Sequence, residues 1–479
     1  MNHSMISYIL GFVLKFEAIF MLLPCLVAVI YREQTGFAYL IMFVFCFGMG
    51  HFFSHKKPEN QIFYAKEGFI MVSLSWLVMS VFGALPFVIT QEIPSFTDAL
   101  FETISGFTTT GASILNDVEA LSHCSLFWRS FTHWVGGMGV FVFILAVLPL
   151  AGGQNVHLLK SESPGPEVGK LVPRLRHTSA ILYGIYFVMT VIEIILLLIA
   201  KMPLFDSITI AFGTAGTGGF GIRNDSIAEY NIHIQNIITV FMILFGVNFN
   251  AYYLLLKKKK ANIFKLEEVR WYFGIIAASI LLITFNIRNM VPNIGMAFQQ
   301  AAFQVGSIIT TTGYSTVDFN QWPELSKNIL VLIMMIGACA GSTGGGIKVS
   351  RIIILFKNLK KELQRFIHPR SVKRIKMDGK VVEPPIVHGV TVFLIAYVII
   401  YAVSCILISI DNFDLETNFT AVAATLNNIG PGLSKVGPTQ NFSLFSPFSK
   451  YVLMFDMLAG RLELFPMLLL FSPSIWKER

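Results

Sequence analysis

Charged residues are scarce in this chain. Asp, Glu, Lys and Arg make up 13% of its 479 residues, whereas hydrophobic residues make up 54%. An ordinary soluble domain carries about 25% charged residues, so a soluble fold of this length is excluded. Apolar runs of roughly 20 residues recur along the sequence, which is the length that a helix needs to cross a bilayer. The composition predicts an all-α polytopic membrane protein.

Cysteine is also rare, and the sequence lacks the spacing of metal or redox sites. The five cysteines are scattered along the chain, with no pair at the separation of a metal or disulfide-exchange motif. The histidines form no His-Glu-x-x-His motif. No nucleophile–base pair stands out, so we expect no enzyme. We also expect no cofactor in this chain, because no Rossmann-like segment is present.

The charges that are present lie unevenly. Basic residues gather in loops on one side of the predicted spans, and acidic residues gather on the other side, as the positive-inside rule requires. This asymmetry predicts cytoplasmic N- and C-termini, and it explains the net charge of +8 without nucleic acid. Binding of a partner or of anionic lipid is an additional role for the basic loops. The basic loops are 56–57, 170–176, 257–260 and 357–380, and the acidic residues are Glu92, Asp98, Glu102, Asp117 and Glu119.

One short glycine-containing stretch occurs four times, at 107–113, 214–221, 309–315 and 426–432. The copies recur at intervals of roughly 100 residues, which indicates an internal repeat and a pseudo-symmetric assembly. Each copy follows an apolar segment too short to span a bilayer, so we expect re-entrant half-helices. Non-helical backbone at membrane depth is tolerated only inside protein or along a water-filled path.

The repeat divides the chain into two extra N-terminal helices followed by four membrane–pore-loop–membrane units. The expected units are 1–58 for the two extra helices, then 59–153, 154–260, 261–365 and 366–479 for the four repeats. The expected long spans are 6–30, 38–53, 69–88, 127–150, 179–200, 234–256, 272–285, 328–356, 387–410 and 451–471, and the expected short helices are 96–105, 203–212, 294–308 and 414–427.

These loops suit ion conduction. Rings of backbone carbonyls can replace the hydration shell of a cation, and glycine adopts the backbone conformations that such rings need. The half-helices also direct their partial negative C-terminal ends toward the centre. Close helix packing is the alternative reason for small residues in a membrane protein. The predicted ion-binding residues are Thr109, Thr110, Gly111, Thr217, Gly218, Gly219, Thr311, Thr312, Gly313, Asn428, Ile429 and Gly430.

The four loops, together with segments 134–139 and 340–348, resemble the Trk/Ktr/HKT superfamily of potassium transporters. The two extra N-terminal helices favour the bacterial TrkH type over the shorter KtrB type. The resemblance implies potassium as the transported ion, a bacterial cell membrane, a homodimer with one pore in each subunit, and a cytosolic TrkA-like nucleotide-binding regulatory subunit. Gly111 stands where sodium-transporting members often have serine, which favours potassium, whereas Asn428 departs from the threonine pattern and leaves strict selectivity open.

The resemblance also implies a gate below the filter. A glycine-rich break in the third repeat would form an intramembrane gate loop, contacted by an arginine of the last span. Arg461 matches that position; its alternative roles are pairing with Glu463 or capping nearby carbonyls. We expect Lys348 and Arg351 to mark the cytoplasmic end of their span. The predicted gate residues are Gly341, Ser342, Thr343, Gly344, Gly345, Gly346 and Arg461.

Two functional alternatives remain at this point. The first is a proton- or sodium-coupled secondary transporter of cations, because discontinuous helices are common in such proteins. The second is a less selective potassium/sodium pathway. Flux of each alkali cation through proteoliposomes separates these alternatives from a potassium channel-like pore.

Overall fold

Longer helices alternate along the chain with the four short helices that lead into the repeated loops. The computed structural model describes residues 2–59, 65–139, 175–256, 266–370 and 373–476. Within these residues, six helices are long and apolar enough to cross a membrane. They are α1 (His3–Tyr31), α2 (Gly36–Ser54), α3 (Ala65–Ile89), α8 (Leu175–Ile199), α12 (Glu267–Ile287) and α16 (Pro384–Ile408).

The short helices follow the predicted pattern. Asn293 caps α13 and Asp414 caps α17, each by accepting a hydrogen bond from a backbone N–H of the first turn, which satisfies a donor that the helix itself cannot pair. Ser95 does the same for α4, while Pro203 precedes α9. The four short helices are α4 (Phe96–Phe107), α9 (Leu204–Gly216), α13 (Ile294–Ile309) and α17 (Leu415–Leu426).

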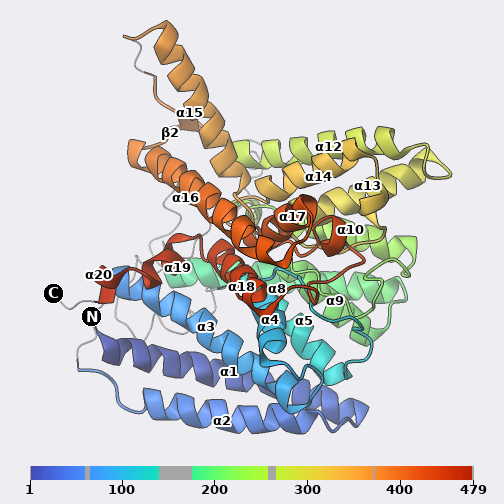
Figure 1. Ribbon diagram of the computed structural model, residues 1–479, viewed down its shortest axis with the longest axis vertical. Helices are drawn as coiled ribbons and strands as arrows, with labels where there is room; N and C mark the ends of the chain where they lie inside the picture. The colour runs from blue at the N-terminus through green and yellow to red at the C-terminus, as the bar shows by residue number, and fades with distance from the viewer. Residues whose placement is uncertain (1, 60–64, 140–174, 257–265, 371–372, 477–479) are drawn as a thin grey trace.

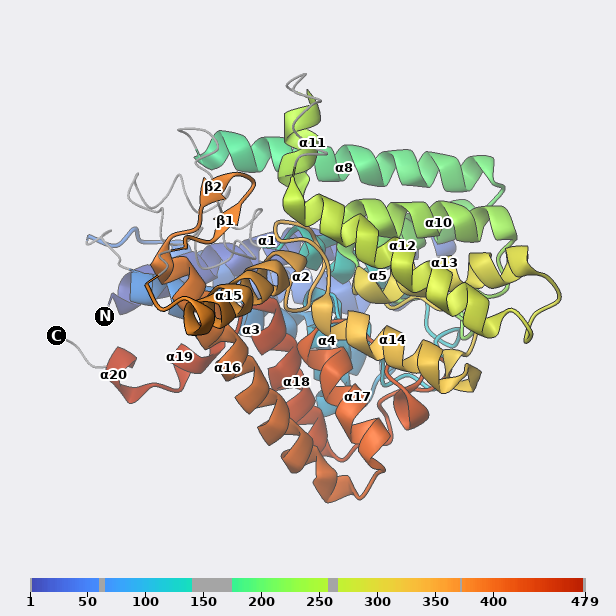
Figure 2. The ribbon, with the colours of Figure 1, turned by 90° about the horizontal axis from the view of Figure 1, so that it is seen from above.

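The helices that follow the loops are interrupted. In repeat one, the loop is followed by α5 (His123–Met138). In repeat two, a single span was expected at 234–256, and this prediction is wrong. The segment forms two helices, α10 (Ile232–Phe245) and α11 (Phe249–Leu256), which meet at 91°. Figure 2 shows α11 turning away from the line of α10. The bend has a physical cause, because Gly246 O accepts from Cys339 N–H and Phe249 N–H donates to Gly341 O. The backbone leaves the helix to pair with the glycine-rich break.

Repeat three contains the expected break, but its second half is longer than predicted. Helix α14 (Glu324–Ile336) ends at the break, residues 337–348, and α15 (Val349–Ile367) continues past residue 356. Figure 1 shows α15 projecting from the body of the molecule. Two short paired strands follow in the basic linker, β1 (Lys376–Met377) and β2 (Lys380–Val381).

The last span is also shorter than predicted. Helix α18 (Pro447–Arg461) ends at Arg461, so the continuous span 451–471 is wrong. Glu463 and Leu464 both have positive φ and separate α18 from α19 (Phe465–Leu470). The carboxylate of Glu463 pairs with Arg351 of α15, which holds the chain out of the helical path. The remaining elements are α20 (Pro473–Trp476) and the 3-10 helices η2 (Phe319–Gln321), η3 (Ser409–Asp411) and η4 (Ser434–Val436).

Some predictions concern segments outside the described residues. They are the second half of span 127–150 and the basic loops at 170–174 and 257–260. The beginning of α1 and helix α20 lie on the same side of the molecule, opposite the turn between α12 and α13 (Figure 1).

The first two helices pack as a tight antiparallel pair along one edge of the molecule (Figure 1). Gly11 and Gly50 make this approach. A Cβ on Gly50 would lie 2.7 Å from Gly11 O, and one on Gly11 would lie 2.8 Å from Gly50 O. Small residues commonly allow such backbone contact between membrane helices.

We therefore expect Gly50→Val to separate α1 from α2 and to lower stability by about 1–3 kcal/mol, as overpacking does. Thermal unfolding in detergent measures the effect. Gly48→Val is the matched control, because a Cβ at Gly48 meets nothing within 4 Å. Equal melting temperatures for the two variants would contradict the close contact.

Candidate functional site

All four loops share one backbone pattern. In each, two residues separated by one position adopt a left-handed φ, and the second is always glycine. Such alternation turns successive carbonyls in ways that regular helix or strand cannot. The pairs are Thr109 (55°) and Gly111 (78°), Thr217 (55°) and Gly219 (79°), Thr311 (61°) and Gly313 (85°), and Asn428 (55°) and Gly430 (99°).

The loops are also neighbours in a closed ring. A Cβ built on the glycine of each loop would meet a carbonyl oxygen of the next loop, at distances below van der Waals contact. The structure therefore brings the predicted glycines of all four repeats around a common centre. The contacts are Gly111 with Gly218 O (2.0 Å), Gly219 with Thr312 O (1.9 Å), Gly313 with Ile429 O (2.0 Å) and Gly430 with Thr110 O (2.8 Å).

The fourth loop departs from the threonine pattern for a structural reason. Asn428 adopts the same left-handed conformation as the threonines at the equivalent position. Its amide donates 2.9 Å hydrogen bonds to Thr110 Oγ1 of the first loop and to Met457 O of α18. Asparagine thus closes the ring between the last repeat and the first. A threonine side chain lacks the N–H donors to make both contacts.

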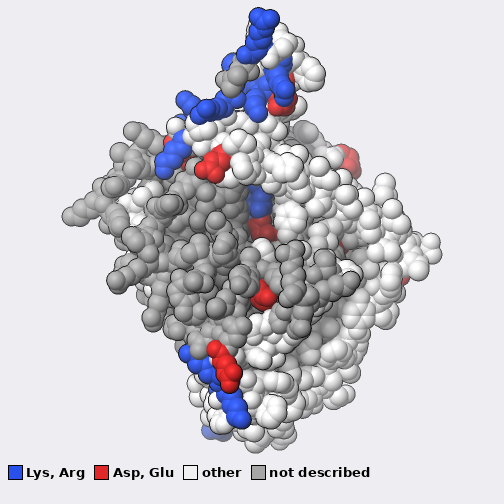
Figure 3. Space-filling view, turned by 90° about the vertical axis from the view of Figure 1, so that its left-hand side faces the viewer, with Lys and Arg blue, Asp and Glu red and all other residues white. Residues whose placement is uncertain are grey.

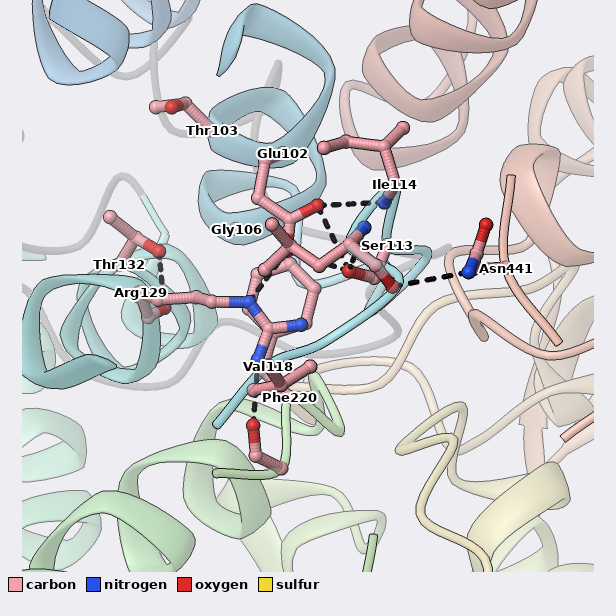
Figure 4. Close-up of polar contacts among 12 residues, drawn as sticks. Glu102, Thr103, Gly106, Ser113, Ile114, Val118, Arg129, Thr132, Phe220 and Asn441 are labelled. Carbon is pink, nitrogen blue, oxygen red and sulfur yellow. Dashed lines mark hydrogen bonds and ion pairs between the residues drawn. The ribbon is translucent and has the colours of Figure 1, made fainter. Parts of the chain in front are cut away.

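A buried ion pair supports the first loop from behind. Glu102, on α4, was expected in an acidic outer loop; that expectation is wrong, because only 1% of the residue is exposed. Its Oε1 lies 2.5 Å from Arg129 Nε. The carboxylate also accepts from Ser113 Oγ and from Ile114 N–H, each at 3.0 Å (Figure 4). These bonds fix the end of loop 107–113 against its own short helix.

Arg129 extends this support to the second repeat. Its guanidinium donates to Gly221 O at 2.7 Å and lies 3.6 Å from the centre of the Phe220 ring. Figure 4 shows Arg129 between Glu102 and Phe220. One side chain therefore ties the loops of repeats one and two together.

His133 bridges the same two repeats. Its Nδ1 lies 2.8 Å from Gly106 O, and its Nε2 accepts from Phe220 N–H at 3.2 Å. Because Nε2 accepts, the proton of the neutral ring lies on Nδ1 and is donated to Gly106 O. Sequence reasoning did not assign this histidine a place beside the filter. The signal that could have found it is its position on the helix that follows the first loop.

The predicted gate loop, residues 341–346, lies against the third and fourth loops. A Cβ at Gly344 would lie 2.8 Å from Thr310 O, and a Cβ at Gly345 would lie 2.3 Å from Asn427 O. These carbonyls belong to the residues that cap α13 and α17. The loop is therefore packed directly against the inner ends of two short helices.

Arg461 contacts the predicted gate loop. Its guanidinium donates to Thr343 O at 2.8 Å and to Gly136 O of α5 at 2.5 Å. The sequence left two other roles open for Arg461, namely pairing with Glu463 and capping nearby carbonyls. Glu463 pairs with Arg351, whereas Arg461 does cap carbonyls. Arg461 joins the break in repeat three to the helix that follows the first loop.

Two further residues, Glu268 and Lys348, hold the break in place. The sequence analysis predicted this role for neither of them. Glu268 of α12 accepts from Ala340 N–H at 2.7 Å and from Ser350 N–H at 3.1 Å, so it anchors both ends of the break. Lys348 was expected at the cytoplasmic end of its span. In the structure it is buried, and its ammonium group donates to Gly344 O. Arg351 is buried as well.

The candidate ligands of the site are backbone carbonyls and threonine hydroxyls. In the described part of the chain, no group of three or more His, Cys, Asp or Glu side chains is arranged to hold a metal ion. Neutral oxygen dipoles can nevertheless solvate an alkali cation as it passes. The site therefore suits passage of an ion better than tight storage.

This fold and this ring define a pore-loop membrane protein with four re-entrant segments. The family of TrkH cation transport proteins matches residues 34–478. The chain therefore belongs to the TrkH family of cation transport proteins, and the predicted resemblance, the all-α fold and the expectation of a transporter instead of an enzyme are confirmed.

Named relatives agree with this membership. The Trk system potassium uptake protein TrkH of Escherichia coli K12 is 36% identical over 487 residues, covering 100% of both chains. The Trk system potassium uptake protein TrkG of the same strain is 34% identical and covers 99% of this chain and 98% of its own. The crystal structure of the potassium transporter TrkH from Vibrio parahaemolyticus superposes with a TM-score of 0.89 at 33% identity, with full coverage of both chains.

We expect Glu102→Ala to destabilise the protein by about 3–5 kcal/mol, because it leaves the buried Arg129 without its counter-ion. The double variant Glu102→Gln/Arg129→Gln should lose less stability than the single variants Glu102→Gln and Arg129→Gln lose in sum, since it removes both charges. A double-mutant cycle of thermal unfolding measures this coupling. Additive losses would show that the ion pair does not hold the loop.

Proposed function

We propose that this chain carries potassium into a bacterial cell through a channel-like pore whose filter is the ring of four loops. The observation that carries the proposal is the closed set of contacts between each loop glycine and the next loop's carbonyl. The relatives are potassium uptake proteins by name, and they cover the whole chain. The proposed ion-binding residues are the twelve filter positions predicted from the sequence.

Backbone oxygens provide the proposed solvation. A cation that enters the ring exchanges water for peptide carbonyls that are already held in position. The C-termini of α4, α9, α13 and α17 lead directly into the four loops, so their partial negative charges favour a cation at the centre. The buried bonds of Glu102, Arg129 and His133 keep the loops from collapsing when the ion leaves.

The loop 341–346 is the proposed gate. It lies against the inner ends of α13 and α17, and Arg461 links it to α5. A guanidinium among these carbonyls also places positive charge close to the proposed ion path, which opposes a cation there. Opening then requires the loop to leave these contacts.

The protein is a multi-pass membrane protein, and we propose that it lies in the bacterial cell membrane as a homodimer with both termini in the cytoplasm. Basic side chains gather over the projecting α15 (Figure 3), on the side of the molecule where the chain begins (Figure 1). Lys360, Arg365 and Arg370 are exposed there. This surface supports the proposed cytoplasmic side and the docking of a TrkA-like nucleotide-binding subunit.

We expect Gly313→Ser to reduce or abolish the preference for potassium over sodium. The added Cβ would lie 2.0 Å from Ile429 O at a φ of 85°, so the ring must widen or distort. Uptake of each alkali cation into proteoliposomes measures the preference. Gly274→Ser on α12 is the control, because its Cβ would meet nothing within 4 Å.

Unchanged selectivity in Gly313→Ser would argue against the filter. The same assay tests the alternative of ion coupling: flux that follows voltage linearly supports a pore, whereas a strict requirement for a proton or sodium gradient supports a coupled transporter.

We expect Arg461→Ala to raise cation flux in the absence of the cytosolic partner, because it removes the hydrogen bonds to Thr343 O and Gly136 O. Loss of one such charged bond shifts an equilibrium by about tenfold or more. Rubidium uptake into liposomes that contain only this chain measures the change. Arg288→Ala, at an exposed position after α12, is the matched control. Equal flux in both variants would exclude the gate role of Arg461.

A further inference from the structure

The third loop differs from the other threonine-bearing loops in the direction of one hydroxyl. Thr109 and Thr217, the left-handed residues of loops one and two, donate their hydroxyls to the carbonyls of Thr108 and Gly216 at 2.7 and 2.6 Å. Thr311 is their equivalent, with a φ of 61°. Its Oγ1 instead accepts a hydrogen bond from Gly345 N–H at 2.6 Å. The symmetry of the ring is therefore broken where it meets the gate loop.

This hydrogen bond is directional and fully buried. Thr311 is 0% exposed, and a buried backbone N–H that loses its partner is destabilised because no water replaces it. The neighbouring contacts of the gate loop with Thr310 O and Asn427 O are close packing contacts. Packing limits how closely the gate loop can approach the filter. The hydrogen bond to Thr311 fixes the position of Gly345 relative to the third loop.

We propose that Thr311 is the positioning residue that holds the gate loop beneath the filter, in addition to its place in the filter itself. The bond exists while the loop lies against the ring and must break before the loop can leave. A change at Thr311 therefore alters the position of the gate loop, whereas a change at the equivalent threonines of loops one and two does not. This inference rests on the proposed function, because it assumes that segment 341–346 moves during gating.

Cys339 offers a readout of loop movement that does not depend on ion flux. It lies in the break just before the gate loop, is 0% exposed, and its N–H is bonded to Gly246 O. The other cysteines are Cys25, Cys46, Cys124 and Cys405, and the experiment replaces them with alanine. In that background, the rate at which methanethiosulfonate ethylammonium modifies Cys339 reports how often the loop opens.

We expect Thr311→Val, which keeps the shape but removes the acceptor, to raise the modification rate by about threefold to tenfold, the effect of losing one hydrogen bond. Thr311→Ser retains the hydroxyl and should return the rate to that of the parent. Thr109→Val and Thr217→Val are matched controls. They alter the filter equally but should leave the Cys339 rate unchanged.

The proposal is overturned if Thr311→Val and Thr217→Val give the same rate, or if Thr311→Ser fails to restore it. Thr311→Ala is the second variant, and monodisperse elution in detergent establishes that each variant is folded. The proposed function fails separately: a parent chain without alkali-cation flux would reject the pore, whereas normal parent flux with equal Cys339 rates would reject only the role of Thr311.

Discussion

The approach of a glycine to the carbonyl of the next repeat is the constraint on which the rest of this structure depends. At three of the four junctions a Cβ would lie about 2 Å from a carbonyl oxygen, and at Gly430 it would lie 2.8 Å from one. A side chain at these positions would push the loops apart, and the ring of peptide oxygens would open. The same four residues have positive φ, a conformation that glycine adopts without steric cost and that other residues adopt only with strain. Geometry and packing thus both require glycine.

Irregular backbone inside a membrane needs partners, because lipid offers no hydrogen bonds to unpaired peptide groups. Around the filter, Glu102, Arg129 and His133 provide them. Around the glycine-rich break, Glu268 and Arg461 serve the same purpose. These five side chains therefore pair with backbone that is not helical, and they connect segments that are distant in sequence.

Local patterns predicted the half-helices closely. The short helix α13 was expected at 294–308 and spans Ile294–Ile309, because the length of its apolar run is a local signal. The bend between α10 and α11 and the early end of α18 were missed for the opposite reason. Phe249 N–H pairs with Gly341 O, and Glu463 pairs with Arg351. An apolar run carries no trace of a partner that lies about 100 residues away.

The sequence by itself determined that this chain crosses a membrane, that its core unit occurs four times, and which glycines stand at each loop. These properties follow from hydrophobicity and backbone freedom, which each residue carries wherever it lies. Only the tertiary structure decided which loops adjoin, why Asn428 stands where the other loops carry threonine, and that Glu102 is buried in an ion pair. Hydrogen bonds between separate repeats depend on distances that exist only after the helices have packed.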